Sequence, residues 1–133
     1  MESANVKVVQ DAYAAFGRGD IPTLLGYMTD DIQWRPAVGT GPHVPFSGTR
    51  TGKQRVAEFF KQVAESEDFE EFAPRDFIAQ ADTVVAIGHY RAVTKASRKR
   101  FESDFVMVFK LRDGRVAEFT EFTDSAAINA AFA

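Results

Sequence analysis

The sequence predicts an α+β fold in which helices roof a curved antiparallel sheet and enclose one apolar pocket. Two observations carry this prediction. Apolar residues recur at helical spacing in the first half of the chain, and after the last of these helices the period changes from about 3.6 to 2 and stays there until Thr123. Helices first and strands afterwards are typical of helices collected on one face of a sheet. A chain of 133 residues needs only one core, so we expect a single domain over residues 1–133.

Three helices are expected before the long strands. An apolar stripe predicts the first helix up to about residue 17, and Asp20 can cap a short second helix. A short strand is expected at 32–34. The segment 36–52 then reads as a loop because it is rich in proline and glycine, and loops of this length often cover a binding site. From Lys53 a helical face returns for about three turns.

The second half reads as strands joined by short turns. Strands are expected at 69–80, 83–94, 101–111 and 116–123, with Pro74 placing the first of them at an edge or a bulge. The basic run 95–100 reads as a hairpin tip, and Asp113-Gly114 as the next turn. Asp124 or Ser125 can cap a short C-terminal helix.

Composition excludes several classes of function. The net charge of −3 argues against nucleic-acid binding, because proteins that bind nucleic acid usually carry a clear excess of basic residues. Without cysteine there is neither a disulfide nor a thiolate metal site, and the two histidines lie too far apart in sequence to suggest a metal centre, so we expect no metal and no cofactor. No leader or membrane-spanning stretch is recognisable, so the expected location is the cytoplasm. Thirteen phenylalanines predict an aromatic-lined interior.

Several short motifs, taken in chain order, resemble those of SnoaL-like and ketosteroid-isomerase-like proteins of the nuclear transport factor 2-like superfamily. The resemblance spans nearly the whole chain. It implies a cone-shaped fold with about three helices on the concave face of a strongly bent sheet, an apolar cavity, and commonly a homodimer through the outer sheet surface. The motifs are Val9-Gln10, Ala14-Ala15-Phe16, Gly19-Asp20, Asp30-Asp31-Ile32-Gln33-Trp34, Gly48-Thr49-Arg50-Thr51-Gly52, Phe109 to Val116, and Phe122-Thr123-Asp124.

The resemblance does not extend to the steroid isomerase's catalytic residues. The positions that would hold its tyrosine, its base and its protonated acid are Ala12, Arg35 or Pro36, and Met107. Steroid isomerisation by that mechanism is therefore not expected, and any likeness to the isomerase describes the fold only.

The resemblance instead draws attention to the last strand. In SnoaL-like cyclases and in limonene epoxide hydrolase an acidic residue on this strand acts as base, and Glu121 occupies the matching position. The hydrolase's further Arg and Asp are replaced by Gly88 and Tyr90, so its carboxylate-arginine-carboxylate arrangement is absent.

Whether Glu121 faces the pocket depends on one turn. A two-residue Asp113-Gly114 loop would set Met107 opposite Thr120 and send Glu121 outside. A three-residue loop beginning at Arg112 would set Phe105 opposite Glu121 and turn the carboxylate inward. We prefer the second register because it also sets Met107 opposite Phe119, which pairs two large apolar side chains.

Two functions follow from this interpretation. In the first, the chain is a cofactor-independent isomerase, cyclase or lyase acting on an apolar carbonyl compound, with Glu121 as base and Tyr90 as hydrogen-bond donor. In the second, the same pocket binds an apolar small molecule without catalysis. Each site residue also has a structural reading: Glu121 as a rim carboxylate, Tyr90 as a packed aromatic, and His43 as a solvated loop residue. The residues expected to line the pocket are Trp34, Phe60, Phe105, Met107, Phe109, Phe119 and, as a lid, His43.

Apolar side chains should also cover the convex face of the sheet. They favour a homodimer through this face. The residues expected there are Val85, Ile87, Val93, Val106 and Val108.

Overall fold

The computed structural model describes residues 2–133 and confirms the expected α+β fold. The first helix, α1 (Glu2–Gly17), is followed by α2 (Ile21–Gly26), whose N-cap Asp20 accepts a hydrogen bond from the Thr23 amide at 3.2 Å. The third helix, α3 (Lys53–Ser66), is one turn longer than predicted. A short α4 (Ser125–Phe132) begins after its N-cap Asp124.

Six strands form one open, mixed sheet in the order β2-β1-β6-β5-β4-β3. All neighbours are antiparallel except β1 and β6, which run parallel. The edge strand β3 carries Pro74 beside a bulge, as the sequence predicts. The strands are β1 (Met28–Val38), β2 (Arg50–Thr51), β3 (Glu67–Gln80), β4 (Thr83–Thr94), β5 (Arg100–Arg112) and β6 (Arg115–Thr123).

The first strand is longer than the sequence suggested. We expected a strand only at 32–34, but β1 extends over eleven residues and includes Pro36. Proline is compatible here because β1 bulges between Arg35 and Val38, where the regular hydrogen-bond ladder with β6 is interrupted. The remaining loop, 39–49, connects β1 to β2.

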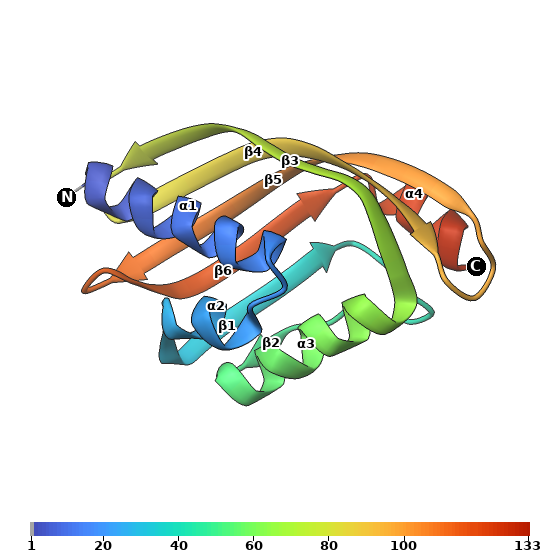
Figure 1. Ribbon diagram of the computed structural model, residues 1–133, viewed down its shortest axis with the longest axis horizontal. Coiled ribbons are helices and arrows are strands. Elements are labelled where there is room, and N and C mark those ends of the chain that lie inside the picture. The colour runs from blue at the N-terminus through green and yellow to red at the C-terminus, as the bar shows by residue number, and fades with distance from the viewer. Residues whose placement is uncertain (1) are drawn as a thin grey trace.

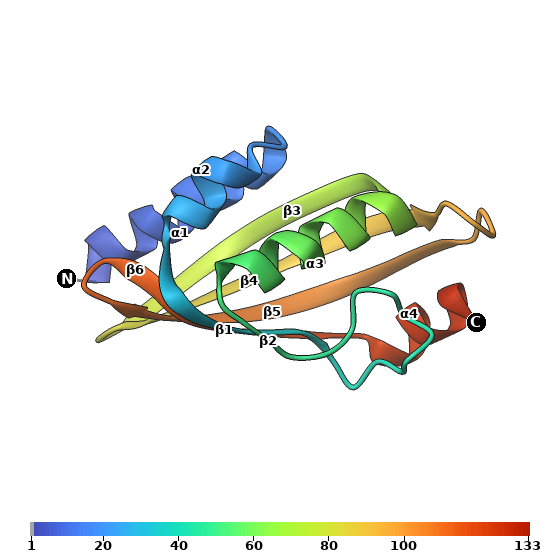
Figure 2. The same cartoon turned by 90° about the horizontal axis from the view of Figure 1, so that it is seen from below.

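The three N-terminal helices lie on one side of the bent sheet, and their apolar faces enclose the core with it (Figures 1 and 2). The helix α4 lies near the end of the sheet where β4 and β5 are joined (Figure 1). Within residues 2–133, no helix combines the length and the apolar character that crossing a membrane requires. The interior between helices and sheet is where the candidate site lies.

Candidate functional site

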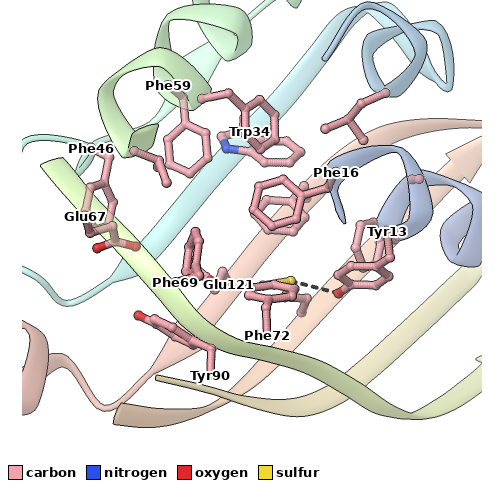
Figure 3. A pocket seen from close by; sticks show the side chains of 17 residues that line it. Tyr13, Phe16, Trp34, Phe46, Phe59, Glu67, Phe69, Phe72, Tyr90 and Glu121 are labelled. Atoms are coloured by element: carbon pink, nitrogen blue, oxygen red, sulfur yellow. Dashed lines mark hydrogen bonds between the residues drawn. The ribbon is translucent and has the colours of Figure 1, made fainter. Parts of the chain in front are cut away.

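An aromatic cavity of about 80 Å³ lies between the concave face of the sheet and helices α1 and α3 (Figure 3). This is several times the ~10–15 Å³ that a single water requires. Its walls are almost wholly apolar and mostly aromatic, which follows from the inward alternation of the Phe-rich strands and the apolar stripes of the helices. The lining residues are Ala12, Tyr13, Phe16, Leu24, Trp34, Phe46, Phe59, Phe60, Val63, Glu67, Phe69, Phe72, Tyr90, Met107, Phe109, Phe119 and Glu121.

Glu121 of β6 is one of two carboxyl groups that line this cavity. Its Oε1 accepts a hydrogen bond of 3.0 Å from the backbone N–H of Ala37. Burial raises the pKa of Glu121 to about 7, although the Ala37 hydrogen bond acts in the opposite direction by favouring the charged form. Glu121 is partly exposed and lines the cavity, so a ligand in the cavity can contact its carboxyl group.

The bulge in β1 explains why Ala37 can make this bond. Arg35 pairs with Thr120 and Val38 with Phe122, so two residues of β1 stand opposite Glu121 alone. Ala37 has a positive φ of 45°, a conformation that costs free energy for a residue with a side chain. The bulge removes its N–H from the regular ladder and aims it at the carboxylate.

Both registers considered for the last hairpin are wrong, although Glu121 does face inward. The turn has two residues, because Arg112 pairs with Arg115. A bulge at Ala117 then shifts the register by one residue, so Met107 lies opposite Glu121 and Phe109 opposite Phe119. An uninterrupted ladder from this turn would set Phe109 opposite Glu118, and the bulge instead pairs Phe109 with Phe119 on the buried face.

Glu67 is the second carboxyl group, and sequence reasoning missed it. It ends α3 and begins β3, and its side chain is 4% exposed. Within the described residues, its Oε2 has no hydrogen-bond partner. Burial, with a smaller contribution from the charge of Glu121, raises the pKa of Glu67 to about 8. A usable indication was present: strand alternation places Glu67 on the same face as Phe69, which also lines the cavity.

Two tyrosines line the cavity besides the carboxyl groups. Tyr90 is buried on β4, and burial together with the nearby carboxylates raises its pKa well above the ordinary value, so its hydroxyl keeps its proton. Tyr13 of α1 donates a hydrogen bond to Met107 Sδ at 2.8 Å, and burial raises its pKa also. Both hydroxyls are neutral near pH 7.

The structure brings together most of the residues that the sequence suggested. Trp34 stacks on Phe119, with ring centroids 3.8 Å apart and an interplanar angle of 15°, and these two strands are paired at the same position. Phe60, Met107 and Phe109 also line the cavity. Aromatic residues that sequence reasoning did not single out complete the wall, namely Tyr13, Phe16, Phe46, Phe59, Phe69 and Phe72.

Two residues expected in the pocket lie outside it. Phe105 is fully buried beneath Phe72, which stacks on it at 5.2 Å between ring centroids and separates it from the cavity. His43 is exposed, and its Nε2 lies 3.2 Å from the carbonyl oxygen of Asn129 in α4. The loop 39–49 instead supplies Phe46 to the cavity, where this side chain is buried.

The ionisable groups of the cavity are acidic. Among the lining residues in the described part of the chain there is no lysine, arginine or histidine. In residues 2–133, no cluster of three or more histidine or acidic side chains is placed to hold a metal ion. The arrangement can therefore accept or donate protons next to an apolar ligand, with two carboxyl groups and two phenolic hydroxyls as its ionisable groups.

Known proteins that are similar to this chain in sequence and structure support the fold described above. The sequence model of the SnoaL-like domain matches residues 9–119. A nuclear transport factor 2-like protein from Burkholderia xenovorans is 28% identical, with a TM-score of 0.90 over 100% of this chain and 98% of that one. One from Burkholderia pseudomallei is 26% identical, with a TM-score of 0.85 over 97% of each chain.

A third similar structure contains a small molecule. TerC, co-crystallised with polyporic acid, is 28% identical and has a TM-score of 0.83 over 97% of this chain and 98% of that one. Comparison with curated proteins gives no match.

Proposed function

The chain belongs to the SnoaL-like domain family, and we propose that it is a cofactor-independent isomerase or cyclase acting on an apolar carbonyl compound. The observation that carries this proposal is the carboxyl group of Glu121, which lines an otherwise aromatic cavity. In this proposal Glu121 is the general base that removes a proton from the carbon next to the carbonyl.

The environment of Glu121 suits that task. A pKa of about 7 makes the group a far stronger base than an ordinary glutamate, while leaving much of it ionised at neutral pH. The Ala37 N–H holds Oε1 in a fixed position, which orients the carboxylate before the substrate arrives. The bulges that create this contact cost backbone free energy, as is common where a side chain is positioned for function.

Tyr90 supports the same step as a hydrogen-bond donor. When the α-proton leaves, negative charge develops on the carbonyl oxygen, and a neutral donor in a cavity that excludes most water stabilises that charge. The raised pKa of Tyr90 keeps its hydroxyl protonated, so it can donate. Tyr90 also lines the cavity, so a ligand there can reach its hydroxyl.

The walls of the cavity favour an apolar ligand with few polar groups. Aromatic rings contribute large apolar contact areas at little entropic cost, and pockets of this type bind through shape and a few placed polar groups. The similarity to TerC, which was crystallised with polyporic acid, supports a small organic molecule as the occupant.

A non-catalytic binder is the alternative function, and it is favoured by the almost wholly apolar lining of the cavity. In that case the same side chains would sequester a ligand, and Glu121 would only accept a hydrogen bond from it. A measurement of proton transfer separates the two functions.

The test uses 2-tetralone, a small apolar ketone whose α-protons exchange in D₂O and can be followed by ¹H NMR. We expect the protein to accelerate exchange and Glu121→Gln to reduce this acceleration about 10²- to 10⁴-fold, the usual contribution of a general base. Glu118→Gln is the matched control, since Glu118 is an exposed carboxylate on the same strand. Equal exchange rates for Glu121→Gln and the wild type would remove Glu121 as the base.

We further propose that a second copy of the chain covers the convex face of the sheet. Ile87, Val106 and Phe122 are 36%, 37% and 46% exposed there and occupy one row across β4, β5 and β6. Such a contiguous apolar row favours a self-complementary contact. Light scattering coupled to size exclusion should give twice the chain mass for the wild type and the chain mass for Phe122→Asp. A monomeric wild type at all concentrations would contradict this proposal.

A further inference from the structure

Glu67 is a buried carboxyl group that the function proposed above does not use. It lines the cavity, is 4% exposed, and has an Oε2 without a hydrogen-bond partner among residues 2–133. An unpaired buried carboxyl group costs stability, because water no longer solvates it and nothing replaces the lost hydrogen bonds. A ligand that accepts a hydrogen bond from this group would remove part of that cost.

The two carboxyl groups influence each other. The charge of Glu121 acts on Glu67, and both charges act on the Tyr90 hydroxyl. No cationic side chain of the described residues lines the cavity to neutralise them. Burial disfavours the charged form of each group, and the charge of Glu121 adds to this for Glu67, so the pair keeps one proton over a range of pH.

That proton resides on Glu67. Glu121 receives the Ala37 N–H, which favours its carboxylate form, whereas Oε2 of Glu67 receives no comparable donor. The direction of the shifts agrees with this assignment, because the pKa of Glu67 is raised further than that of Glu121. At neutral pH the cavity therefore presents one carboxylate and one carboxylic acid.

We propose that Glu67 is the acid partner of Glu121, donating its proton to the carbonyl oxygen of the ligand while Glu121 takes the proton from the adjacent carbon. This inference rests on the proposed function. In the step, the C–H bond breaks and its electron pair forms a C=C bond. The carbonyl π electrons bind the proton of Glu67, giving a neutral enol, protonated Glu121 and ionised Glu67. In a β,γ-unsaturated ketone this enol is a dienol, and transfer of the proton from Glu121 to its γ-carbon, with recovery of the enol proton by Glu67, completes an isomerisation to the α,β-unsaturated ketone.

The positions of these side chains in the cavity are compatible with Glu67 as the acid and Glu121 as the base. Glu67 lies at one side of the cavity with Phe46 above it, and the Tyr90 hydroxyl lies on that same side (Figure 3). Glu121 appears between Phe69 and Phe72 in this view (Figure 3). A carbonyl oxygen directed to the Glu67 and Tyr90 side would leave the neighbouring carbon for Glu121.

The pair also specifies the charge of the ligand. An anionic ligand would add a further negative charge to a cavity that already holds one and lacks a cationic side chain, so it is disfavoured. The substrate class is accordingly a neutral, apolar ketone with an acidic α-hydrogen, rather than a carboxylic acid in its ionised form.

The first test needs no ligand. Protein with ¹³C-labelled glutamate carboxyl groups is titrated from pH 4 to pH 10 by NMR, and Glu67→Gln and Glu121→Gln assign the two resonances. We expect Glu121 to ionise before Glu67, and Glu67 to ionise at lower pH in Glu121→Gln because the like charge is gone. Ionisation of Glu67 below pH 6 in the wild type would overturn the inference, since no acid would remain at neutral pH.

The second test follows α-proton exchange of 2-tetralone as a function of pH. We expect a bell-shaped rate profile for the wild type, rising as Glu121 ionises and falling as Glu67 ionises, with limbs near pH 7 and 8. Glu67→Gln, which has nearly the same shape but cannot release a proton, should lose about 10²-fold in rate and also lose the alkaline limb. A residue with a merely structural role would not remove that limb.

The outcomes separate the two proposals. Loss of exchange in Glu121→Gln, with an unchanged rate and alkaline limb in Glu67→Gln, overturns the role of Glu67 and leaves Glu121 as base. If the wild type does not catalyse exchange, the proposed function fails. In that case the ¹³C chemical shift of the carbonyl carbon of bound, labelled 2-tetralone tests whether Glu67 donates a hydrogen bond to the ligand. An identical shift in the wild type and Glu67→Leu, whose side chain cannot donate a hydrogen bond, or no binding at all, overturns the hydrogen bond.

Discussion

The two buried carboxyl groups should make the stability of the protein fall as pH rises from 5 to 9. Both have folded-state pKa values above the ordinary value of 4.5, about 7 for Glu121 and about 8 for Glu67. The folded state therefore binds more protons than the unfolded state over this range. The stabilisation is fully present below pH 4.5 and is lost as the pH passes through 7 and 8.

The size of this pH-dependent loss of stability follows from the two pKa shifts. At about 1.4 kcal/mol for each pKa unit, the upper limits are about 3 kcal/mol for Glu121 and about 5 kcal/mol for Glu67. Water that enters the cavity relieves part of the cost, so we expect a total loss of about 3–8 kcal/mol between pH 5 and pH 9. This is a large fraction of the ~7–20 kcal/mol typical for a chain of this length.

Urea unfolding measures this loss directly. Trp34 is the single tryptophan and is buried against Phe119, so its fluorescence reports the transition. We expect the free energy of unfolding to fall with pH in the wild type and in the control Glu118→Gln, and to fall about half as steeply in Glu121→Gln or Glu67→Gln. A change below about 1 kcal/mol between pH 5 and pH 9 would refute the reasoning, as would equal slopes in all four proteins.

Two further substitutions test contacts elsewhere in the fold, one within the sheet and one at the N-terminus of α4. Gly88→Ala should destabilise the protein by about 1–3 kcal/mol in urea or thermal unfolding, because a Cβ at this position would meet the Ala73 carbonyl oxygen and lie 2.5 Å from Phe105 Cζ. Gly26→Ala, where nothing lies within 4 Å of the new methyl group, is its control, and equal losses would contradict the steric reason. Asp124→Ala should cost about 1 kcal/mol by removing the N-cap of α4, and Asp124→Asn should retain most of that stability.

The fold could be predicted because local patterns and the final structure agree. The apolar stripe of α1, the Asp20 cap and the alternation of β4 and β5 each indicate an element that the structure contains. The boundaries of β1 could not be predicted, because a strand that continues through Pro36 depends on a bulge and on its partner β6, far away in the sequence.

The site was predictable to a lesser degree. Glu121 could be identified from the resemblance, but its facing depends on a bulge that neither considered register contained. Its Ala37 partner depends on a backbone distortion that the residue types do not indicate. Phe105 was expected in the wall because alternation gives the face of a residue and not its depth, and Phe72 covers it. Glu67 was overlooked because acidic residues next to a helix end are normally solvated, whereas here the helix α3 and the strand β3 meet over the cavity.

The bulge at Ala117 has a consequence for how this site can change over time. Beyond it, every residue of β6 pairs one position further along than in an uninterrupted ladder from the same turn, so Glu121 and not Thr120 lies opposite Met107. Deleting one residue beyond the bulge, such as Thr120, would move Glu121 opposite Val108 on the outer face and bring Phe122 opposite Met107, replacing the carboxylate in the cavity without any substitution in it. Length changes in this strand are therefore a short mutational route between proteins that share a fold and differ in chemistry.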